Sequence, residues 1–292
     1  MKPARPVLIS GCSSGIGYAC AVALRQHGWR VFAGARADED LRMLWDQGLE
    51  AVQLDLDESA SIAAAVNTVL ASTDGRLDAL FNNAGFGQPG AVEDLSRDAL
   101  RAQFETNLFG AQELTNQVIP TMRRQGHGRI IYNSSVLGFA ALPYRGAYVA
   151  SKFAMEGLVD TLRMELHDSG IHVSLVEPGP IATRFRANAY RRFKANIDAE
   201  TSPHARAYRA MERRLSAPER VGGFTLHADA VVRKVQRALN SRRPKPRYYV
   251  TVPTYLFGFL RRGLSSRAMD RVLMTSTRRE RRLPPERDES GV

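Results

Sequence analysis

The stretch RPVLISGCSSGIG, residues 5–17, decides the fold. It opens with a short apolar run, and a helical pattern follows the glycines to about His27. Glycines in such a turn let a pyrophosphate approach backbone N–H groups, and the N-terminus of the next helix attracts negative charge. The spacing GxxxGxG is neither GxGxxG nor the phosphate loop that ends in glycine and lysine. We predict a strand–turn–helix unit that binds a dinucleotide, with a purely structural turn as the alternative.

Outward from this unit, short β-type runs alternate with helical stretches such as 61–72 and 99–122. Strands separated by helices of this length indicate βαβ units and a parallel sheet. The predicted strands are 5–10, 30–35, 50–56, 77–83, 129–135, 172–178 and 247–252. The fold class is therefore α/β, a Rossmann-type doubly wound parallel sheet of about seven strands in three α/β/α layers, with ligands beyond the C-terminal strand ends.

Composition excludes several classes of protein. The 292 residues are 44% apolar and 24% charged, which rules out a disordered, collagen-like or disulfide-stapled chain. The two cysteines, Cys12 and Cys20, form no CxxC pair, so we expect no metal site. The first apolar run is too short for a signal peptide, and no apolar run approaches 18 residues. We expect a cytoplasmic protein.

The chain is expected to form one domain over residues 1–276. Residues 184–226 contain many arginines and no strand pattern, and they predict a helical or mobile segment that covers the substrate site. Residues 247–276 form a C-terminal extension that is first apolar and then basic. Residues 277–292 are charged and poor in core residues, which predicts a disordered tail.

The net charge of +11 is concentrated in the second half of the chain. Residues 1–150 hold 13 Lys/Arg and 15 Asp/Glu, whereas residues 151–292 hold 28 and 15. A solvated arginine-rich surface is the simplest interpretation, peripheral contact with an anionic membrane is the next, and nucleic acid is the least favoured. The apolar stretch PTYLFGFLRRGL, residues 253–264, could lie on a membrane surface or pack against a second subunit.

The end of the second predicted strand indicates which dinucleotide binds. Sheets that bind NAD usually place a carboxylate there for the ribose 2′-hydroxyl. Here the strand ends Gly34-Ala35-Arg36, without a carboxylate. Because the Arg36 guanidinium can pair with a 2′-phosphate, we predict NADP(H) in preference to NAD(H). The alternative is that Arg36 is an ordinary surface residue.

Tyr148 and Lys152 form a YxxxK spacing inside a clear helical stretch. Residues four apart share one helix face, so the two side chains are neighbours. An ammonium beside a phenol stabilises the phenolate and lowers the tyrosine pKa. Tyr148 is therefore a candidate general acid and base near neutral pH, and an ordinary exposed helix pair is the alternative.

Several motifs occur in a fixed order along the first 185 residues. They are the glycine loop, Asn82–Gly85 (NNAG), Asn107, Ser135 thirteen residues before Tyr148, Lys152, and Pro178–Thr183 (PGPIAT). In this set the chain resembles the short-chain dehydrogenase/reductase (SDR) family. It is similar to bacterial NADP-dependent aldehyde reductases near the hydroxysteroid and retinol dehydrogenase branch.

The resemblance implies a catalytic role for four residues. Tyr148 would donate the proton to a carbonyl oxygen, and Lys152 would lower its pKa and bind the nicotinamide ribose. Ser135 would hydrogen-bond the substrate oxygen, with Ser134 as the neighbouring alternative. Asn107 would hold a water molecule that links Lys152 to solvent, and helix packing is the alternative for this amide.

The resemblance also implies a set of cofactor contacts. Asp55 would bind the adenine amino group, and Thr183 would contact the carboxamide or the diphosphate. The full set is Gly11, Ser13, Ser14, Gly15, Ile16, Gly17, Arg36, Asp55, Leu56, Asn83, Ala84, Gly85, Tyr148, Lys152, Pro178, Gly179, Ile181 and Thr183.

Apolar residues surround the predicted catalytic segment and suit an apolar substrate. The substrate candidates are Val136, Leu137, Phe139 and Phe185, with Leu142, Tyr190 and Phe193 beside them, and each aromatic could instead cover the core. The family resemblance implies a homodimer or homotetramer built on the helices at about 98–125 and 147–169.

These observations predict an NADPH-dependent reductase of aldehydes or ketones. The alternative within the class is an alcohol, hydroxysteroid or retinol-type dehydrogenase that works in oxidation. A different class, a cofactor-binding sensor or membrane scaffold, would need no general acid such as Tyr148.

Overall fold

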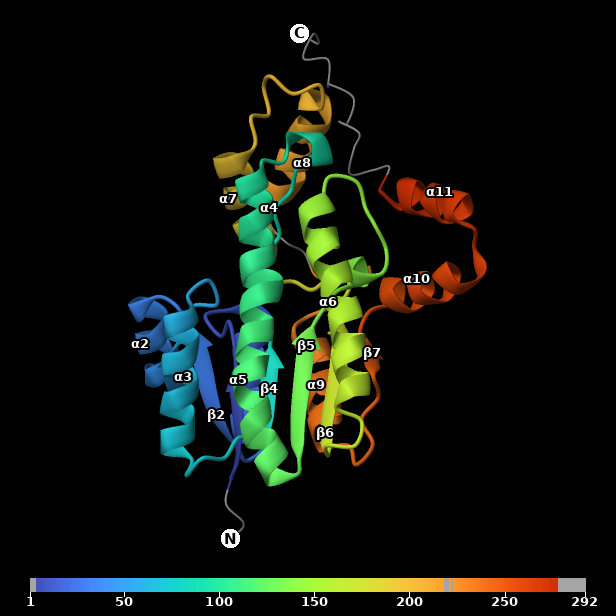
Figure 1. Cartoon of the computed structure of the whole chain (residues 1–292). Helices are drawn as coiled ribbons and strands as arrows, with labels where there is room; N and C mark the ends of the chain where they lie inside the picture. The colour runs from blue at the N-terminus through green and yellow to red at the C-terminus, as the bar shows by residue number, and fades with distance from the viewer. Residues whose placement is uncertain (1–3, 218–220, 222, 278–292) are drawn as a thin grey trace.

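The computed structural model describes residues 4–217, 221 and 223–277. Seven parallel strands form one sheet in the order β3-β2-β1-β4-β5-β6-β7 (Figure 1). The strands are β1 (Arg5–Ile9), β2 (Trp29–Ala35), β3 (Glu50–Gln53), β4 (Ala79–Asn82), β5 (Gly128–Asn133), β6 (Ile171–Glu177) and β7 (Arg247–Tyr249). The predicted fold class is confirmed; β2 ends at the predicted residue, and the other six strands end one to three residues earlier than the sequence pattern indicated.

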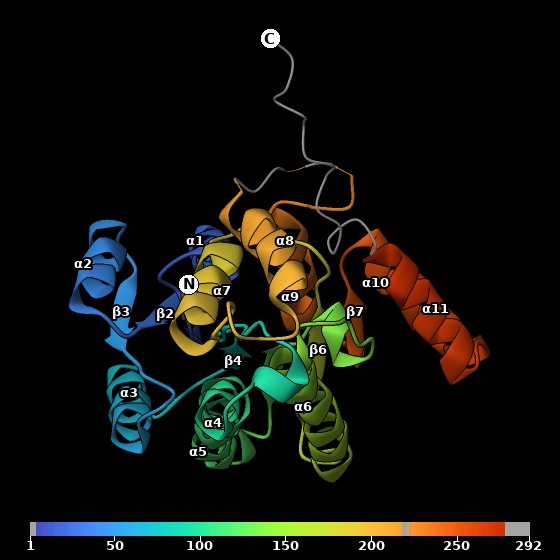
Figure 2. The ribbon, with the colours of Figure 1, turned by 90° about the horizontal axis from the view of Figure 1, so that it is seen from above.

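Helices cover both faces of the sheet, as Figure 2 shows from above. They are α1 (Gly15–Gln26), α2 (Asp38–Asp46), α3 (Ser59–Ser72), α4 (Arg97–Phe104), α5 (Gly110–Gln125), α6 (Gly146–Glu165), α7 (Phe185–Asn196), α8 (Ala205–Ser216), α9 (Asp229–Asn240), α10 (Val252–Gly263) and α11 (Ser266–Ser276). Short turns η1 (Val92–Asp94) and η3 (Val136–Gly138) complete the set. Within the described residues, no helix is both long and apolar enough to cross a bilayer.

Strand β1 shows how the sequence builds the three layers. Val7 and Ile9 point to the face packed by α1, α2 and α9, whereas Leu8 points to the face packed by α3, α5 and α6. All three side chains are fully buried. A strand that is buried on both faces must be apolar throughout, which explains the unbroken run that the sequence carries there.

The sequence predicts one continuous helix over 99–122, and the structure corrects this. Helix α4 ends at Phe104, a π-helical turn η2 (Glu105–Phe109) follows, and α5 begins at Gly110. A π turn contains one residue more per hydrogen-bonded ring than an α-helix, so it shifts every later side chain around the axis. Such turns are frequent at functional sites, and this one contains Asn107.

The segment after β6 is helical and packed on the body of the protein. Helices α7 and α8 share a small core that includes Phe193 and Tyr208. The Tyr208 hydroxyl accepts a hydrogen bond from Ala91 N at 2.9 Å and donates one to the Asp94 carboxylate. Tyr190 packs against the same core. Of the apolar residues predicted near the substrate, Tyr190 and Phe193 therefore stabilise this helical pair.

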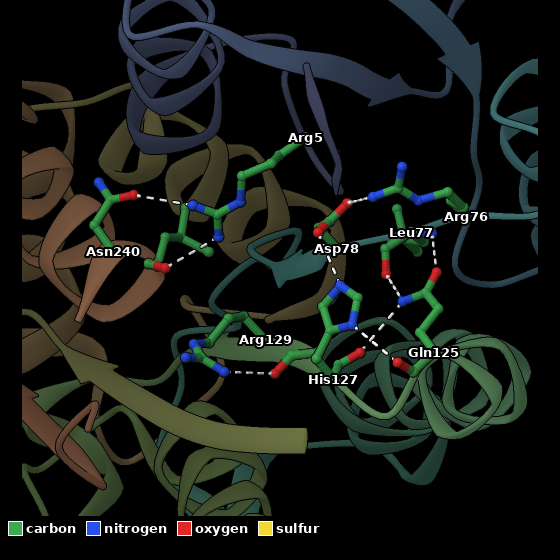
Figure 3. A network of polar contacts seen from close by, with 10 residues as sticks. Arg5, Arg76, Leu77, Asp78, Gln125, His127, Arg129 and Asn240 are labelled. Atoms are coloured by element: carbon green, nitrogen blue, oxygen red, sulfur yellow. Dashed lines mark hydrogen bonds and ion pairs between the residues drawn. The ribbon is translucent and has the colours of Figure 1, made fainter. Parts of the chain in front are cut away.

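A polar network lies where the central strands begin, at the end of the sheet opposite the predicted site (Figure 3). The buried Asp78 carboxylate contacts His127 Nε2 at 3.1 Å and Arg76 at 3.5 Å. Arg5 of β1 donates to Asn240 Oδ1, at the end of α9, at 3.4 Å. These contacts join helix ends to strand starts. They explain why such polar residues are tolerated next to a buried sheet, because buried charge must be paired.

Gly110 marks the closest contact between a helix and a loop. A Cβ placed on it would lie 1.9 Å from the carbonyl oxygen of Leu56. We predict that Gly110→Ala lowers the free energy of unfolding by about 1–3 kcal/mol, since the loop must move away from α5. Thermal unfolding measures the loss.

Gly157→Ala is the matched control, because a Cβ on Gly157 in helix α6 meets no atom within 4 Å. This change should be neutral or stabilising by up to about 1 kcal/mol, the ordinary gain of alanine over glycine in a helix. Equal effects of the two substitutions would contradict the packing assigned to Gly110.

Candidate active site

The end of β5 and the start of α6 bring the predicted catalytic side chains together. A hydrogen bond joins the side chains of Ser135 and Tyr148. Lys152 Nζ lies 5.7 Å from the centre of the Tyr148 ring and donates to the carbonyl oxygen of Asn133 at 2.7 Å. One helical turn separates Tyr148 from Lys152, so both face the strand end, as the YxxxK spacing predicts.

The structure separates the two serine candidates. Ser135 is bonded to Tyr148 and also accepts a hydrogen bond from Leu137 N at 3.1 Å. The hydroxyl of Ser134 is buried and has no hydrogen-bond partner among the described residues. It lies next to the position that a Cβ on Gly138 would take, beside the Glu156 side chain. Ser135 is therefore the serine whose hydroxyl meets Tyr148.

Burial changes the proton affinities of the Tyr148 and Lys152 side chains. It raises the pKa of Tyr148 to about 12, against the opposing effect of the Ser135 hydrogen bond. It lowers the pKa of Lys152 to about 8, which the nearby Glu156 carboxylate opposes. The sequence predicted a lowered tyrosine pKa, and the structure corrects this because desolvation of the phenolate outweighs the Ser135 hydrogen bond. Tyr148 is therefore protonated at neutral pH.

Asn107 fixes the loop after β4 to helix α6. Its Oδ1 accepts from Phe86 N at 3.0 Å, and its Nδ2 donates to Phe86 O at 3.0 Å and to Ser151 Oγ at 3.2 Å. A Cβ on Gly85 would lie 2.9 Å from Asn107 Oδ1, so this approach needs glycine. Because Asn107 lies on the π turn, its amide is directed across the site instead of along the helix.

The glycine loop is held by the loop after β4. Ser10 Oγ accepts hydrogen bonds from Asn83 N and Ala84 N at 3.0 and 3.1 Å. The Asn83 side chain returns two bonds of 3.0 Å to the carbonyl oxygens of Ser10 and Gly11. Gly11 has φ +73°, and a Cβ on it would lie 2.7 Å from Ala84 Cα. Two separate loops thus form one rigid platform at the end of β1.

The residues present fit the diphosphate of a dinucleotide. Ser14, the N-cap of α1, makes no side-chain capping bond, and the first turn of α1 holds no acidic residue. The N–H groups of this turn are therefore suited to an anion, and the helix dipole favours the same charge. Thr183 lies over the turn, with its Cβ 3.2 Å from the position of a Cβ on Gly15. Thr183 therefore lies beside the glycine loop, and its predicted contact with the carboxamide or the diphosphate stays a prediction.

The segment 178–183 reaches the site from the end of β6. Pro178 O accepts from Val136 N at 2.8 Å, next to Ser135. Ile181 pairs with Leu226 in an isolated bridge. A Cβ on Gly179 would lie 2.1 Å from Thr251 Oγ1, so glycine is required there. The predicted cofactor residues of this segment therefore lie at the same edge as the glycine loop.

Arg36 lies at the end of β2 with Asp55 and Asp57 beside it. Its Nη1 is 4.0 Å from one carboxylate oxygen of each, and 58% of its side chain is exposed. Asp55 lies two residues beyond the end of β3, and Leu56 follows it on the loop. At 4.0 Å the ion pairs are at the limit of contact, so they restrain the guanidinium only weakly.

A buried ionic cluster behind Lys152 was not predicted from the sequence. Arg247 of β7 donates to Glu156 and, at 2.5 Å, to Glu177 and Asp160. Burial raises the pKa of Glu177 well above the ordinary carboxyl range, and Glu156 adds to this shift. The only sequence signal was the position of Glu156, four residues after Lys152. The cluster acts on Lys152 through Glu156, whose charge raises the pKa of the lysine against the effect of burial.

Comparison with known proteins agrees with this geometry. A family model described as short chain dehydrogenase matches residues 5–193. The fold and the site define an oxidoreductase that acts on alcohol and carbonyl groups with a nicotinamide cofactor. The chain belongs to the short-chain dehydrogenase/reductase family.

Two relatives and one solved structure illustrate the similarity. The chain is 43% identical to the uncharacterized oxidoreductase YbbO of Escherichia coli K12 over 269 residues, which cover 92% of this chain and 94% of YbbO. It is 40% identical to human 17-beta-hydroxysteroid dehydrogenase type 1 over 191 residues, covering 61% and 57%. A short-chain dehydrogenase from Burkholderia phymatum in complex with NAD superposes with a TM-score of 0.74, at 25% identity, covering 96% and 97%.

The ionic cluster generates a prediction about stability. A carboxyl whose pKa is raised by folding stabilises the protein below its ordinary pKa, and this contribution is lost as the pH rises through the folded value. We expect the stability of the unmodified protein, relative to Glu177→Gln, to fall between about pH 5 and about pH 9. The fall should exceed about 1.4 kcal/mol, the equivalent of one pKa unit.

Thermal or urea unfolding at a series of pH values measures this difference. Glu165→Gln at the exposed end of α6 is the control, and its difference from the unmodified protein should stay flat with pH. A flat difference for Glu177→Gln as well would show that Glu177 is charged throughout and that Arg247 fully compensates it.

Proposed function

We propose that the protein is an NADPH-dependent reductase of aldehydes or ketones with apolar bodies. The observation that carries the proposal is the position of Tyr148, bonded to Ser135 and one helical turn from Lys152, at the end of the parallel sheet. A phenol in this position can donate a proton to a carbonyl oxygen, as carbonyl reduction requires. We also propose that NADP(H) is the cofactor in the cell and that the protein is cytoplasmic.

Each side chain of the site has its own role in the proposed reaction. Ser135 hydrogen-bonds the substrate oxygen and holds it against Tyr148. Tyr148 donates its proton to that oxygen, and the Lys152 ammonium stabilises the phenolate that remains. When bound, the nicotinamide supplies the hydride to the carbonyl carbon. Asn107 keeps the loop at Phe86 and helix α6 in register, and we propose that it also holds the water that returns a proton to Lys152.

Arg36 supports the preference for NADP(H). Strand β2 ends in Ala35 without a carboxylate, so no negative charge at that position repels a 2′-phosphate. Arg36 is exposed and weakly held, and it can turn from Asp55 and Asp57 towards a phosphate. The Burkholderia phymatum structure holds NAD, so the preference proposed here rests on this chain's own Arg36.

Apolar side chains around Tyr148 support the proposed substrate class. Val136, Leu137 and Phe139 are buried in one cluster, with Leu142 and Tyr148 packed against it. The Phe185 ring also lies near Tyr148, at 5.4 Å between ring centres, and Phe185 is 39% exposed. A carbonyl compound that reaches Tyr148 therefore meets hydrocarbon, which favours an apolar body.

Oxidation of an alcohol is the second candidate reaction. The name of the human relative, 17-beta-hydroxysteroid dehydrogenase type 1, favours it. In that direction the same Tyr148 would have to lose its proton first, and the high pKa of its hydroxyl makes this costly at neutral pH. The direction in the cell is set by the ratio of oxidised to reduced cofactor, and we propose that NADP(H) drives reduction.

We also propose a homodimer or homotetramer that buries the outer faces of α5 and α6. Phe109, at the start of α5, is 52% exposed, and Leu158 and Met164 of α6 are also exposed. Large apolar side chains grouped on neighbouring helices are typical of subunit contacts.

The cofactor proposal is tested with Arg36→Ala. Hydrogen bonds to a charged phosphate are worth about 1.5–3 kcal/mol, so NADPH binding should weaken about tenfold to a hundredfold. NADH binding should stay nearly unchanged. Calorimetric titration of each cofactor measures both, and Arg42→Ala, an exposed arginine on the adjacent α2, is the control. Equal losses for NADPH and NADH would contradict the role of Arg36.

The reaction is tested by NADPH consumption over a ladder of aldehydes and ketones of increasing chain length. Tyr148→Phe should lower turnover by about 10²–10⁴-fold, since it removes the general acid, and NADPH should still bind. Tyr190→Phe, in the core of α7 and α8, is the control and should keep its turnover. Binding of NADPH without turnover of any substrate would contradict the reductase and favour a cofactor-binding sensor.

A further inference from the structure

Helices α10 and α11 project from the body of the protein beyond β7 (Figures 1 and 2). The inner side of α10 packs on the protein through residues such as Thr254 and Gly258, which are buried. Its outer side carries a row of large apolar side chains that are exposed. They are Val252, Tyr255, Leu256 and Phe259, and Phe259 is 76% exposed. The spacing i, i+3, i+4, i+7 places them on one face of the helix.

Exposed basic residues lie beside this apolar row and on the helix that follows it. Arg262 follows Phe259 by three residues and is exposed. Lys234 of α9 lies on the other flank, where Nζ donates to the Tyr255 hydroxyl at 3.3 Å. Arg267 and Arg271 of α11 are exposed nearby along the chain. Residues 252–276 contain four arginines and one aspartate, so the projecting pair has a net charge of +3.

The same two helices form the outer wall of the candidate active site. Met269 and Leu273 of α11 are buried in the cluster with Val136 and Phe139, against which Tyr148 packs. Arg261 of α10 donates to Phe139 O at 3.1 Å. One layer of helix thus separates the exposed apolar row from the apolar cluster beside Tyr148.

Charge decides which partner suits this surface. A symmetric contact with a second copy would place the same patch against itself, so arginine would face arginine. Four apolar side chains are also few for a stable subunit contact, which needs about 800 Å² per partner. An anionic lipid surface offers the opposite charge at its headgroups and hydrocarbon beneath them. Both features of the patch are then satisfied at once.

We propose that the outer face of α10, with its rim of Lys234, Arg262, Arg267 and Arg271, docks on an anionic phospholipid surface. Docking itself is independent of the reaction. Docking would let the protein take up an apolar carbonyl compound from the lipid, close to the wall of the active site. This role of docking rests on the proposed function.

Cosedimentation of the full chain with vesicles tests the docking. We expect at least tenfold stronger partition into vesicles of phosphatidylcholine with about one third phosphatidylserine than into phosphatidylcholine alone, with weakening at high salt because surface charge is screened. Phe259→Glu should reduce partition at least tenfold. Trp45→Glu, which changes a 58% exposed aromatic on α2, should leave it unchanged.

The charged rim is tested by the double change Arg262→Glu with Arg267→Glu, which should abolish the preference for anionic vesicles. Unchanged partition in Phe259→Glu, or equal binding to both kinds of vesicle, would overturn the proposal. A shift of Phe259→Glu from dimer to monomer in sedimentation, with partition unaffected, would assign the face to a second copy instead.

Vesicle binding is measured without cofactor or substrate, so it stands apart from the reaction. Reduction of a short water-soluble aldehyde by Phe259→Glu should match that of the unmodified protein. If no aldehyde is reduced and vesicles still bind, the proposed function fails and the docking stands. If the aldehyde is reduced and vesicles do not bind, the docking proposal fails and the proposed function stands.

Discussion

The exchange of hydrogen bonds between Ser10 and Asn83 holds the candidate site together. The Ser10 hydroxyl receives the backbone of the loop after β4, and the Asn83 amide returns two bonds to the turn after β1. Asn83 Oδ1 in turn accepts from the side chain of Asn133, at the end of β5. Three adjacent strand ends are thereby fixed relative to one another. The glycine loop and the segment leading to Ser135 keep their separation only because this network is rigid.

The second constraint is electrostatic and lies behind the site. Lys152 is buried, and burial lowers its pKa to about 8 even though the nearby Glu156 carboxylate opposes the shift. Arg247 fixes Glu156 together with Glu177 and Asp160. Strand β7 therefore contributes to the site although it carries none of the reacting groups. The C-terminal extension has a similar indirect role, since α10 and α11 wall the apolar cluster beside Tyr148.

Much of the fold and site could be predicted from local sequence. Apolar runs separated by helical spacing gave the seven strands, and strand–glycine–helix context gave the dinucleotide turn. What depended on three-dimensional packing could not be predicted. The π turn around Asn107 adds one residue to the hydrogen-bonded ring of the helix. The spacing of apolar residues in the sequence barely changes, so it predicts an unbroken helix. Glu177 and Arg247 are 70 residues apart. The raised pKa of Tyr148 reflects burial, which the YxxxK spacing does not encode.

In the proposed reaction, the site transfers hydride from a nicotinamide to a carbonyl carbon while Tyr148 supplies the proton. The most direct measurement is reduction of an apolar aldehyde with NADPH deuterated at C4, followed by mass spectrometry of the alcohol. We expect one deuterium on the carbinol carbon and solvent hydrogen on the oxygen. An alcohol without cofactor deuterium, or cofactor oxidation without alcohol, would contradict it.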